Sequence, residues 1–254
     1  MPALLEAASD LSPELVSRFT GAEIEGLISG SSPAQIIASL PSGAEASFSL
    51  SSDLVGLRVN AKQINWQKPA KKPAQFRLTG RYNKRVLTDA FSLTGAGLNL
   101  EGAVDYAEQE KFKSLSISKL QVDDILDVFG QFNPAMGIEI FGGWVNFPNL
   151  MAGMPETNAA QTAPLALKVA LDEVVLGENK LTEFRADLIS APQLSGPFSA
   201  KVNGVAQVVA VLSPLNGRTA LEVTSEQAGR LLTSVGALQS ATGGQLKLNL
   251  TPTQ

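Results

Sequence analysis

The chain has 254 residues, of which 44% are hydrophobic and 17% charged, with a net charge of −4 at pH 7 and neither histidine nor cysteine. This composition excludes a cysteine nucleophile, a histidine general base, disulfides, and zinc sites built from thiolate or imidazole ligands. An acidic chain also lacks the basic footprint of a nucleic-acid-binding protein, so we expect no nucleic-acid partner.

Residues 1–44 are predicted to form a short helical N-terminal segment. Two Ser-Pro pairs, beginning at Ser12 and Ser32, each place a helix N-cap before a proline at the first helical position. The stretches SPELVSRF (12–19) and SPAQIIASL (32–40) are therefore expected to be short helices. The first ten residues lack a basic head and a long apolar run, so we expect no signal peptide.

From Ala46 onward, apolar residues alternate with polar ones at a period of two. In the stretch 98–106, the apolar residues Leu98, Leu100, Val104 and Tyr106 share one face, and LKLNL (246–250) shows the same alternation. One apolar face and one polar face are typical of antiparallel strands. The chain is therefore predicted to be mainly β.

A longer pattern occurs once in each half of the chain. LSISKLQVDDILDVFG (115–130) matches LEVTSEQAGRLLTSVG (221–236), and weaker matches precede and follow both copies in the same order. Each copy predicts several strands, a short helix (122–129 and 226–235) and a further strand after a glycine. A unit of this kind cannot bury its apolar face alone and needs stacked neighbours.

The predicted fold is an elongated, curled antiparallel sheet with an open groove, built from two homologous units with short helices. The helical segment 1–44 is followed by a first β-rich unit, 45–150, and by a second, 151–254. The segment is expected to be monomeric, although open sheet edges invite continuation by further strands.

Asp123 and Asp124 are an adjacent carboxylate pair at the start of a predicted helix. Neighbouring helical residues diverge by about 100°, whereas a glycosidase needs two carboxyl groups that converge to about 5–10 Å. The pair fits a helix cap and a first-turn acid better. We therefore expect no catalytic residue, no metal and no cofactor, and an enzyme acting on a glycan is the least favoured function.

Lys68, Lys71 and Lys72 form a basic cluster in a turn bounded by prolines. Such a cluster fits contact with anionic lipid head groups, at about 1 kcal/mol per lysine near a charged surface. It also fits a solvated hairpin tip with no ligand, which is the preferred interpretation.

The second copy of the repeat combines three features: a strand ending at Ser225, a helix with Ala228-Gly229 before paired leucines, and Gly243-Gly244 before the next strand. In the first copy, INWQKPAKKPAQFRLTG (64–80) and LTGAGLNLEGAVDY (93–106) add a Lys-Pro turn and a glycine-rich strand pair. Together these features resemble the AsmA-like proteins of Gram-negative envelopes, in the YhdP-like branch. The resemblance extends from about residue 45 to the last residue.

The resemblance implies a periplasmic segment of a protein anchored in the inner membrane. The sequence departs from the family in that we expect no anchor within this chain. The resemblance also implies a non-catalytic role, in which a hydrophobic β-groove shields phospholipid acyl chains and supports lipid transport between the inner and outer membranes and envelope integrity. Membrane surfaces would be reached only through the full-length protein. The residues expected to line the groove are Phe91, Leu93, Leu98, Leu100, Val104, Tyr106, Leu221, Val223, Leu246 and Leu248.

The alternative is a structural or interaction module for outer-membrane biogenesis without a lipid path. The apolar face of the strands suits both functions. It could line a lipid groove, or it could pack against a second layer, as such faces do in most β proteins. An open apolar trough would favour the lipid groove, and a filled core would favour the structural module.

Overall fold

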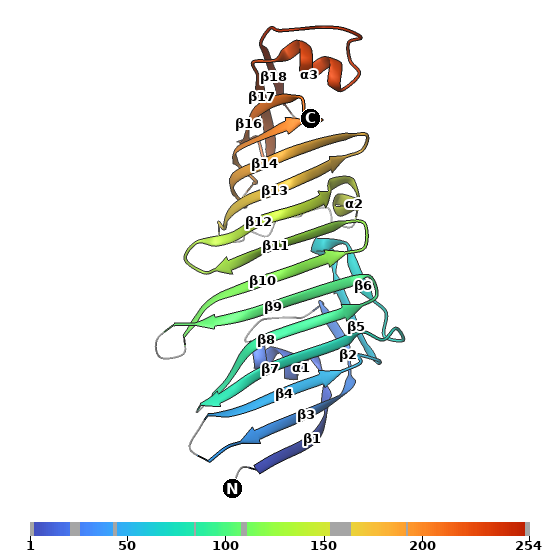
Figure 1. Ribbon diagram of the computed structural model, residues 1–254, viewed down its shortest axis with the longest axis vertical. Coiled ribbons are helices and arrows are strands. Elements are labelled where there is room, and N and C mark those ends of the chain that lie inside the picture. The colour runs from blue at the N-terminus through green and yellow to red at the C-terminus, as the bar shows by residue number, and fades with distance from the viewer. Residues whose placement is uncertain are drawn as a thin grey trace. The chain divides into compact units, whose positions relative to one another are not determined.

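The structure is a computed structural model that describes residues 3–20, 26–42, 45–83, 85–107, 111–152, 164–191 and 193–251. Strands dominate this part of the chain, as the alternating pattern predicts, and three α-helices and one short 3-10 helix accompany them (Figure 1). The chain divides into two compact units. Unit 1 is built from residues up to Asp124, and unit 2 mainly from Ile125 onward.

In unit 1, seven strands form an antiparallel sheet in the order β1-β3-β4-β7-β8-β9-β10. These strands are β1 (Ala3–Leu11), β3 (Ser32–Leu40), β4 (Ala46–Ser52), β7 (Gln75–Asn83), β8 (Arg85–Gly95), β9 (Leu98–Tyr106) and β10 (Phe112–Val122). Alternation along β9 directs Leu98 and Leu100 to one face, as predicted, and Asn99 and Glu101 to the other.

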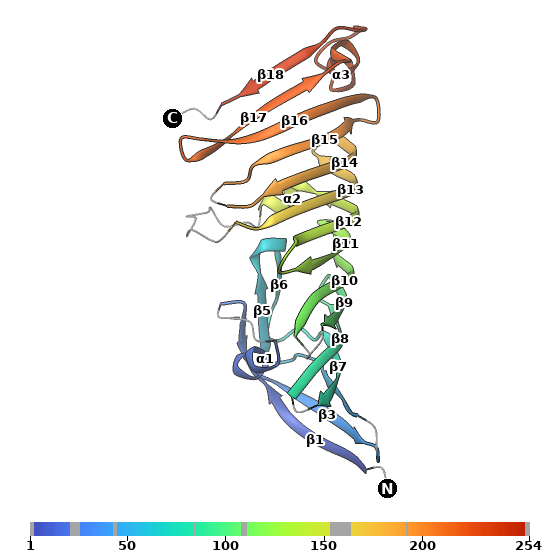
Figure 2. The same cartoon turned by 90° about the vertical axis from the view of Figure 1, so that its left-hand side faces the viewer.

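A smaller sheet covers part of the main sheet of unit 1 on one face (Figure 2). Its strands lie in the order β2-β5-β6 and are β2 (Ile28–Gly30), β5 (Leu57–Ala61) and β6 (Trp66–Lys68). The 3-10 helix η1 (Lys62–Ile64) joins β5 to β6, and the helix α1 (Pro13–Thr20) lies beside them. We call α1, β2, β5, η1 and β6, with the loops between them, the capping layer.

In unit 2, eight strands follow one another in chain order from β11 to β18. They are β11 (Leu126–Asn133), β12 (Gly137–Asn146), β13 (Ala166–Leu176), β14 (Asn179–Ile189), β15 (Gly196–Val202), β16 (Ala206–Leu215), β17 (Arg218–Ser225) and β18 (Leu246–Leu250). The prediction of a wholly antiparallel sheet is wrong at β12 and β13, which are parallel. The connection between them carries the helix α2 (Phe147–Ala152), and such a long crossover is what parallel neighbours require.

The helix α3 (Ala228–Ser234) covers one end of the unit 2 sheet. Its Leu231 is buried against small apolar residues of two strands, and Phe184, Val223 and Leu246 pack around this cluster. The buried strand residues are Ala200, Val202, Ala206 and Val208. The predicted helix near 226–235 is therefore confirmed, and its apolar side anchors it to the sheet.

The prediction of a helical segment over residues 1–44 is wrong, because its described residues are mainly the strands β1, β2 and β3; of the two helices predicted there, only the first forms. The helix α1 begins after Ser12, whose hydroxyl accepts a hydrogen bond of 3.4 Å from the backbone N–H of Leu15, as an N-cap does. The stretch 32–40 is instead strand β3, which pairs with β1 on one side and β4 on the other. Pro33 lies at the beginning of this strand, where a missing N–H is tolerated.

The helix predicted over 122–129 does not form either. Strand β10 ends at Val122, and β11 begins at Leu126, which pairs with Val145 of β12. Asp123 lies in the turn between the strands with a φ of 32°, and its N–H donates to the carbonyl of Gly97 at 2.8 Å. The pairing of β11 with β12 therefore makes this stretch a strand, although its local sequence pattern favours a helix.

The two sequence copies therefore differ in structure where the pattern predicts a helix. Strands β8 to β10 and strands β15 to β17 are both antiparallel meanders. A strand follows the first meander and the helix α3 follows the second. A meander is common in β proteins, so this similarity alone does not establish a duplication.

Candidate functional site

An apolar row crosses the main sheet of unit 1 from β7 to β10. Phe76 pairs with Leu93, Leu93 with Leu100, and Leu100 with Leu120. Directly paired residues of neighbouring antiparallel strands lie on the same face. The four side chains therefore form one continuous apolar surface, which includes two of the predicted groove residues.

This row is one wall of a cavity of about 260 Å³, whose opposite wall is the capping layer. Every residue that lines the cavity is apolar. From the sheet these include Phe76, Leu93, Leu98, Leu100 and Leu120. From the capping layer they include Val16, Leu54, Leu57, Ala61, Ile64 and Trp66. Such a lining offers an occupant dispersion contacts and burial from water, but no hydrogen bond and no charge.

Three predicted groove residues, Leu93, Leu98 and Leu100, thus line a partly enclosed cavity, in which Leu98 is buried and Leu93 and Leu100 are half-buried. Leu98 is only 4% exposed, because the capping layer covers it. Phe91 lies farther along the face, where its ring packs on Gly102; a Cβ at Gly102 would lie 2.5 Å from the Phe91 ring. Val104 and Tyr106 continue the same face of β9 and do not line the cavity.

A buried lysine holds the capping layer together. The Lys68 side chain is 0% exposed, and its Nζ donates to the carbonyl oxygens of Leu54 and Leu57, both at 2.7 Å, and of Pro69 at 3.3 Å. Burial lowers the pKa of Lys68, and the nearby Asp53 carboxylate acts in the opposite direction. The three hydrogen bonds occupy all the donors of the ammonium group.

The interpretation of Lys68 as part of a solvated basic cluster is therefore wrong. Alternation along β6 turns Trp66 and Lys68 inward and Gln67 outward. Lys71 and Lys72 are exposed in the following turn, as predicted. The three lysines look alike in the sequence, and only the inward position of Lys68 separates them.

Leu54, which lines the cavity, has a left-handed backbone with a φ of 54°. This conformation is uncommon for a bulky residue and costs conformational energy. It is held from both sides: the Leu54 N–H donates to the Ser52 hydroxyl at 3.1 Å, and the Leu54 carbonyl accepts from Lys68. The Ser52 hydroxyl lies 3.0 Å from that of Ser32 on strand β3. Hydrogen bonds to buried polar groups therefore fix this wall of the cavity.

In unit 2, the remaining predicted groove residues lie on β17 and β18. Leu221 pairs with Leu250 and Val223 with Leu248, so these four share one face. Val223 and Leu246 pack against the buried cluster beneath α3. Leu248 and Leu250 are 42% and 50% exposed. The apolar face is thus covered by the helix at one end of β18 and open to solvent at the other.

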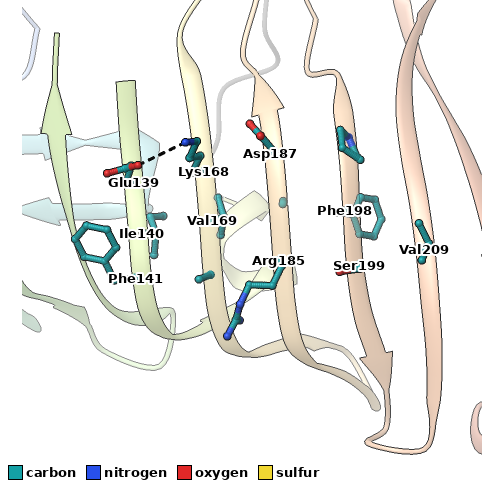
Figure 3. A pocket seen from close by; sticks show the side chains of 13 residues that line it. Glu139, Ile140, Phe141, Lys168, Val169, Arg185, Asp187, Phe198, Ser199 and Val209 are labelled. Carbon is teal, nitrogen blue, oxygen red and sulfur yellow. Dashed lines mark ion pairs between the residues drawn. The ribbon is translucent and has the colours of Figure 1, made fainter. Parts of the chain in front are cut away.

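Unit 2 also contains a hollow, which was not predicted. It lies over strands β12 to β16 and has a volume of about 570 Å³ (Figure 3). Glu139, Lys168 and Asp187 form a row of alternating charge across three strands, because Glu139 pairs with Lys168 and Lys168 with Asp187. The ion pair between Glu139 and Lys168 measures 3.9 Å. Phe141 and Val209 add apolar surface. Polar residues alternate with apolar ones along β13 and β14, and this pattern is the sequence signal that could have indicated the hollow.

No group of three or more acidic, histidine or cysteine side chains with the spacing of a metal site occurs in the described ranges. Across the same residues, no helix has both the length and the apolar character needed to span a membrane. Comparison of the chain with protein-family models, with curated proteins and with solved structures gives no significant match.

Proposed function

We propose that the chain is a periplasmic, non-catalytic segment of an AsmA-like envelope protein, in which the apolar face of the sheet shields lipid acyl chains. In this proposal the segment acts as a monomer and supports phospholipid transport between the inner and outer membranes. The curling of the sheet into a groove and the origin of the two units by duplication belong to the same proposal.

The observation that carries the proposal is the open apolar face at the end of unit 2. Leu248 and Leu250 expose 42% and 50% of their surface beside the half-buried Leu221 and Val223. Burying apolar surface contributes about 25 cal/mol per Å². Contiguous exposed apolar surface is typical of a site that meets an apolar partner.

The mechanism is passive. An acyl chain has no hydrogen-bonding group, so a surface that shields it needs only apolar side chains at van der Waals distance. Leucine and valine residues on β17 and β18 would replace the contacts between lipid tails, while the charged head group stays in water. Head groups would not be desolvated in this arrangement, which avoids a large electrostatic cost.

The proposal is tested by phospholipid that co-purifies with the protein from the periplasm of a Gram-negative host. Mass spectrometry under native conditions should detect bound phospholipid on the wild-type protein. Leu248→Asp should reduce it several-fold while the protein stays folded, because the side chain is already partly solvated. Lys247→Asp changes the neighbouring residue on the opposite face, where it removes an exposed ion pair with Glu222, and is the matched control, with lipid content unchanged. Wild-type protein free of phospholipid would refute the proposal.

One observation favours the structural module as the second candidate. In unit 1, protein covers part of the apolar face, since the capping layer leaves Leu98 only 4% exposed. A face covered in this way packs like the core of a layered β protein. The same mass spectrometry separates the two functions, because a structural module carries no phospholipid.

A further inference from the structure

The cavity of unit 1 has the size of a site for a small molecule. Its volume is about 260 Å³. An engineered cavity of about 150 Å³, lined by leucine, isoleucine and phenylalanine, binds benzene and xenon. Pockets for drug-sized ligands measure about 300–1,000 Å³. The cavity therefore fits a molecule of one or two aromatic rings, which is much smaller than a lipid with two acyl chains.

The lining selects against water and against polar ligands. A buried water needs two to four polar partners, and the side chains around this cavity are apolar. The one side chain among them with a polar group is Trp66, and its indole N–H already donates to the carbonyl of Ala96 at 2.8 Å. A ligand hydroxyl placed here would lose its bonds to water without replacement.

Hydrogen bonds fix the wall of the cavity that the capping layer forms. Packing alone would let the capping layer settle onto the sheet and fill the space. Instead, the Lys68 ammonium ties the carbonyls of Leu54 and Leu57 at 2.7 Å each, and Ser52 holds the N–H of Leu54. The Trp66 bond to Ala96 attaches the capping layer to the β8–β9 turn. These bonds hold an uncommon backbone conformation at Leu54 and so fix the position of this wall of the cavity.

We propose that this cavity is a binding site for an uncharged apolar molecule of arene size. Binding fills a preformed space and leaves the hydrogen bonds of Lys68, Ser52 and Trp66 unchanged. The site is independent of the acyl-chain surface proposed for unit 2, since it lies within unit 1 and involves none of the residues of β17 and β18.

Thermal unfolding in the presence of benzene and of naphthalene tests the proposal. The melting temperature of the wild-type protein should rise with ligand concentration, by about 5–10 °C at a free concentration of one hundred times Kd. Methyl resonances of Leu57 and Leu98, which face the cavity, should shift in the same titration. Phenol should bind at least tenfold more weakly than benzene, because its hydroxyl finds no partner.

Ala61→Leu is the blocking variant. Ala61 lines the cavity with a negative φ of −94°, which leucine also adopts, and the added isopropyl group occupies part of the space, so the rise in melting temperature induced by naphthalene, the larger probe, should fall several-fold. Ala90→Leu, on the other face of the sheet, is the matched control and should respond to benzene like the wild-type protein.

Three results would overturn the proposal: a wild-type protein whose melting temperature and methyl resonances do not respond to benzene or naphthalene, an Ala61→Leu variant that responds to naphthalene as the wild-type protein does, or an affinity for phenol equal to that for benzene. If Ala61→Leu does not fold, the methyl resonances of the wild-type protein still decide, because shifts confined to residues outside the cavity contradict the assignment.

Discussion

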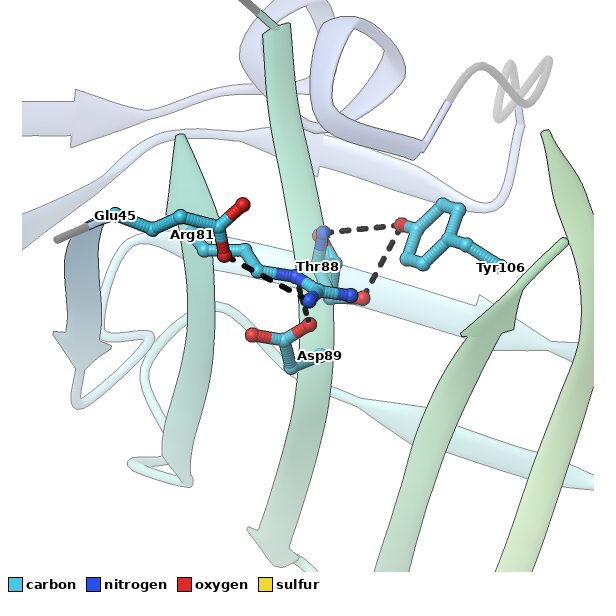
Figure 4. A network of polar contacts seen from close by, with 5 residues as sticks. All are labelled: Glu45, Arg81, Thr88, Asp89 and Tyr106. Atoms are coloured by element: carbon cyan, nitrogen blue, oxygen red, sulfur yellow. Dashed lines mark hydrogen bonds and ion pairs between the residues drawn. The ribbon is translucent and has the colours of Figure 1, made fainter. Parts of the chain in front are cut away.

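The phenol oxygen of Tyr106 lies between the two backbone polar groups of Thr88 (Figure 4). It accepts from the Thr88 N–H at 3.0 Å and donates to the Thr88 carbonyl at 3.1 Å. The pairing of β8 with β9 runs from Gly95 opposite Leu98 to Ala90 opposite Ala103, and Thr88 lies beyond it. The tyrosine hydroxyl therefore takes the place of a neighbouring strand at the point where the two strands separate.

An irregularity in the adjoining strand pair lies at the same place. Between β7 and β8 the register shifts so that Gly80 pairs with Thr88 and Asp89 is left without a partner in the ladder. The Asp89 carboxylate instead forms an ion pair of 3.1 Å with Arg81 (Figure 4). A bulge of this kind bends a strand and redirects side chains.

Tyr106→Phe should lower the free energy of unfolding by about 1–3 kcal/mol, because it leaves the N–H and carbonyl of Thr88 without the hydroxyl. Tyr82→Phe is the control: that side chain is 54% exposed, so the change should stay within about 0.5 kcal/mol. Urea denaturation measures both. Equal stability of the two variants would show that the hydroxyl of Tyr106 contributes nothing to the sheet.

Lys68→Met should destabilise the protein by about 2–4 kcal/mol, since methionine matches the length of lysine but leaves the carbonyls of Leu54, Leu57 and Pro69 without donors. Lys71→Met, at an exposed position of the next turn, should change the free energy of unfolding by less than about 0.5 kcal/mol. Denaturation of both variants in the same buffer measures the two free energies of unfolding. A Lys68→Met variant as stable as Lys71→Met would contradict the role of this lysine.

The lowered pKa of Lys68 predicts a pH dependence of stability. Because burial lowers the pKa in the folded protein, the unfolded chain binds the Lys68 proton more tightly than the folded one. The contribution of Lys68 to the free energy of unfolding should therefore rise with pH, from below its lowered pKa up to the ordinary value of 10.5. The difference in unfolding free energy between wild type and Lys68→Met, followed from neutral pH to 10.5, isolates this contribution. A difference that falls over this range would contradict the direction of the shift.

Leu100→Asp and Leu248→Asp should have opposite outcomes although both place a carboxylate on a predicted groove residue. Leu100 is half-buried and lines the apolar cavity beneath the capping layer, where a carboxylate finds no polar side chain to pair with, so this variant should lose several kcal/mol of stability. Leu248→Asp should lose about 1 kcal/mol or less, because water reaches this position. Circular dichroism during thermal unfolding distinguishes them. A stable Leu100→Asp protein would mean that the capping layer opens readily.

The alternation of apolar and polar residues predicted strands from Ala46 onward, such as β9 and β18. It is a local property, since neighbouring side chains of a strand point to opposite faces whatever lies beyond them. The signals for the helices α1 and α3 are local as well. The Ser12 hydroxyl caps α1 by accepting from the N–H of Leu15 in the first turn, and the apolar residues of α3 lie on one side of the helix. These elements could be predicted from the sequence because their signals are contained within a few residues.

The tertiary structure decided what covers each face. Ser32 and Pro33 carry the same helix signal as Ser12 and Pro13, yet pairing with β1 and β4 on both sides makes β3 a strand. Lys68 resembles Lys71 in sequence, but its Nζ reaches carbonyls of residues that are distant in the chain. Leu98 and Leu248 show the same period of two, and only the first lies beneath the capping layer. Burial depends on contacts between distant segments, and the free energy of those contacts exceeds the few tenths of a kcal/mol per residue, or about 1 kcal/mol per cap, that local preferences contribute.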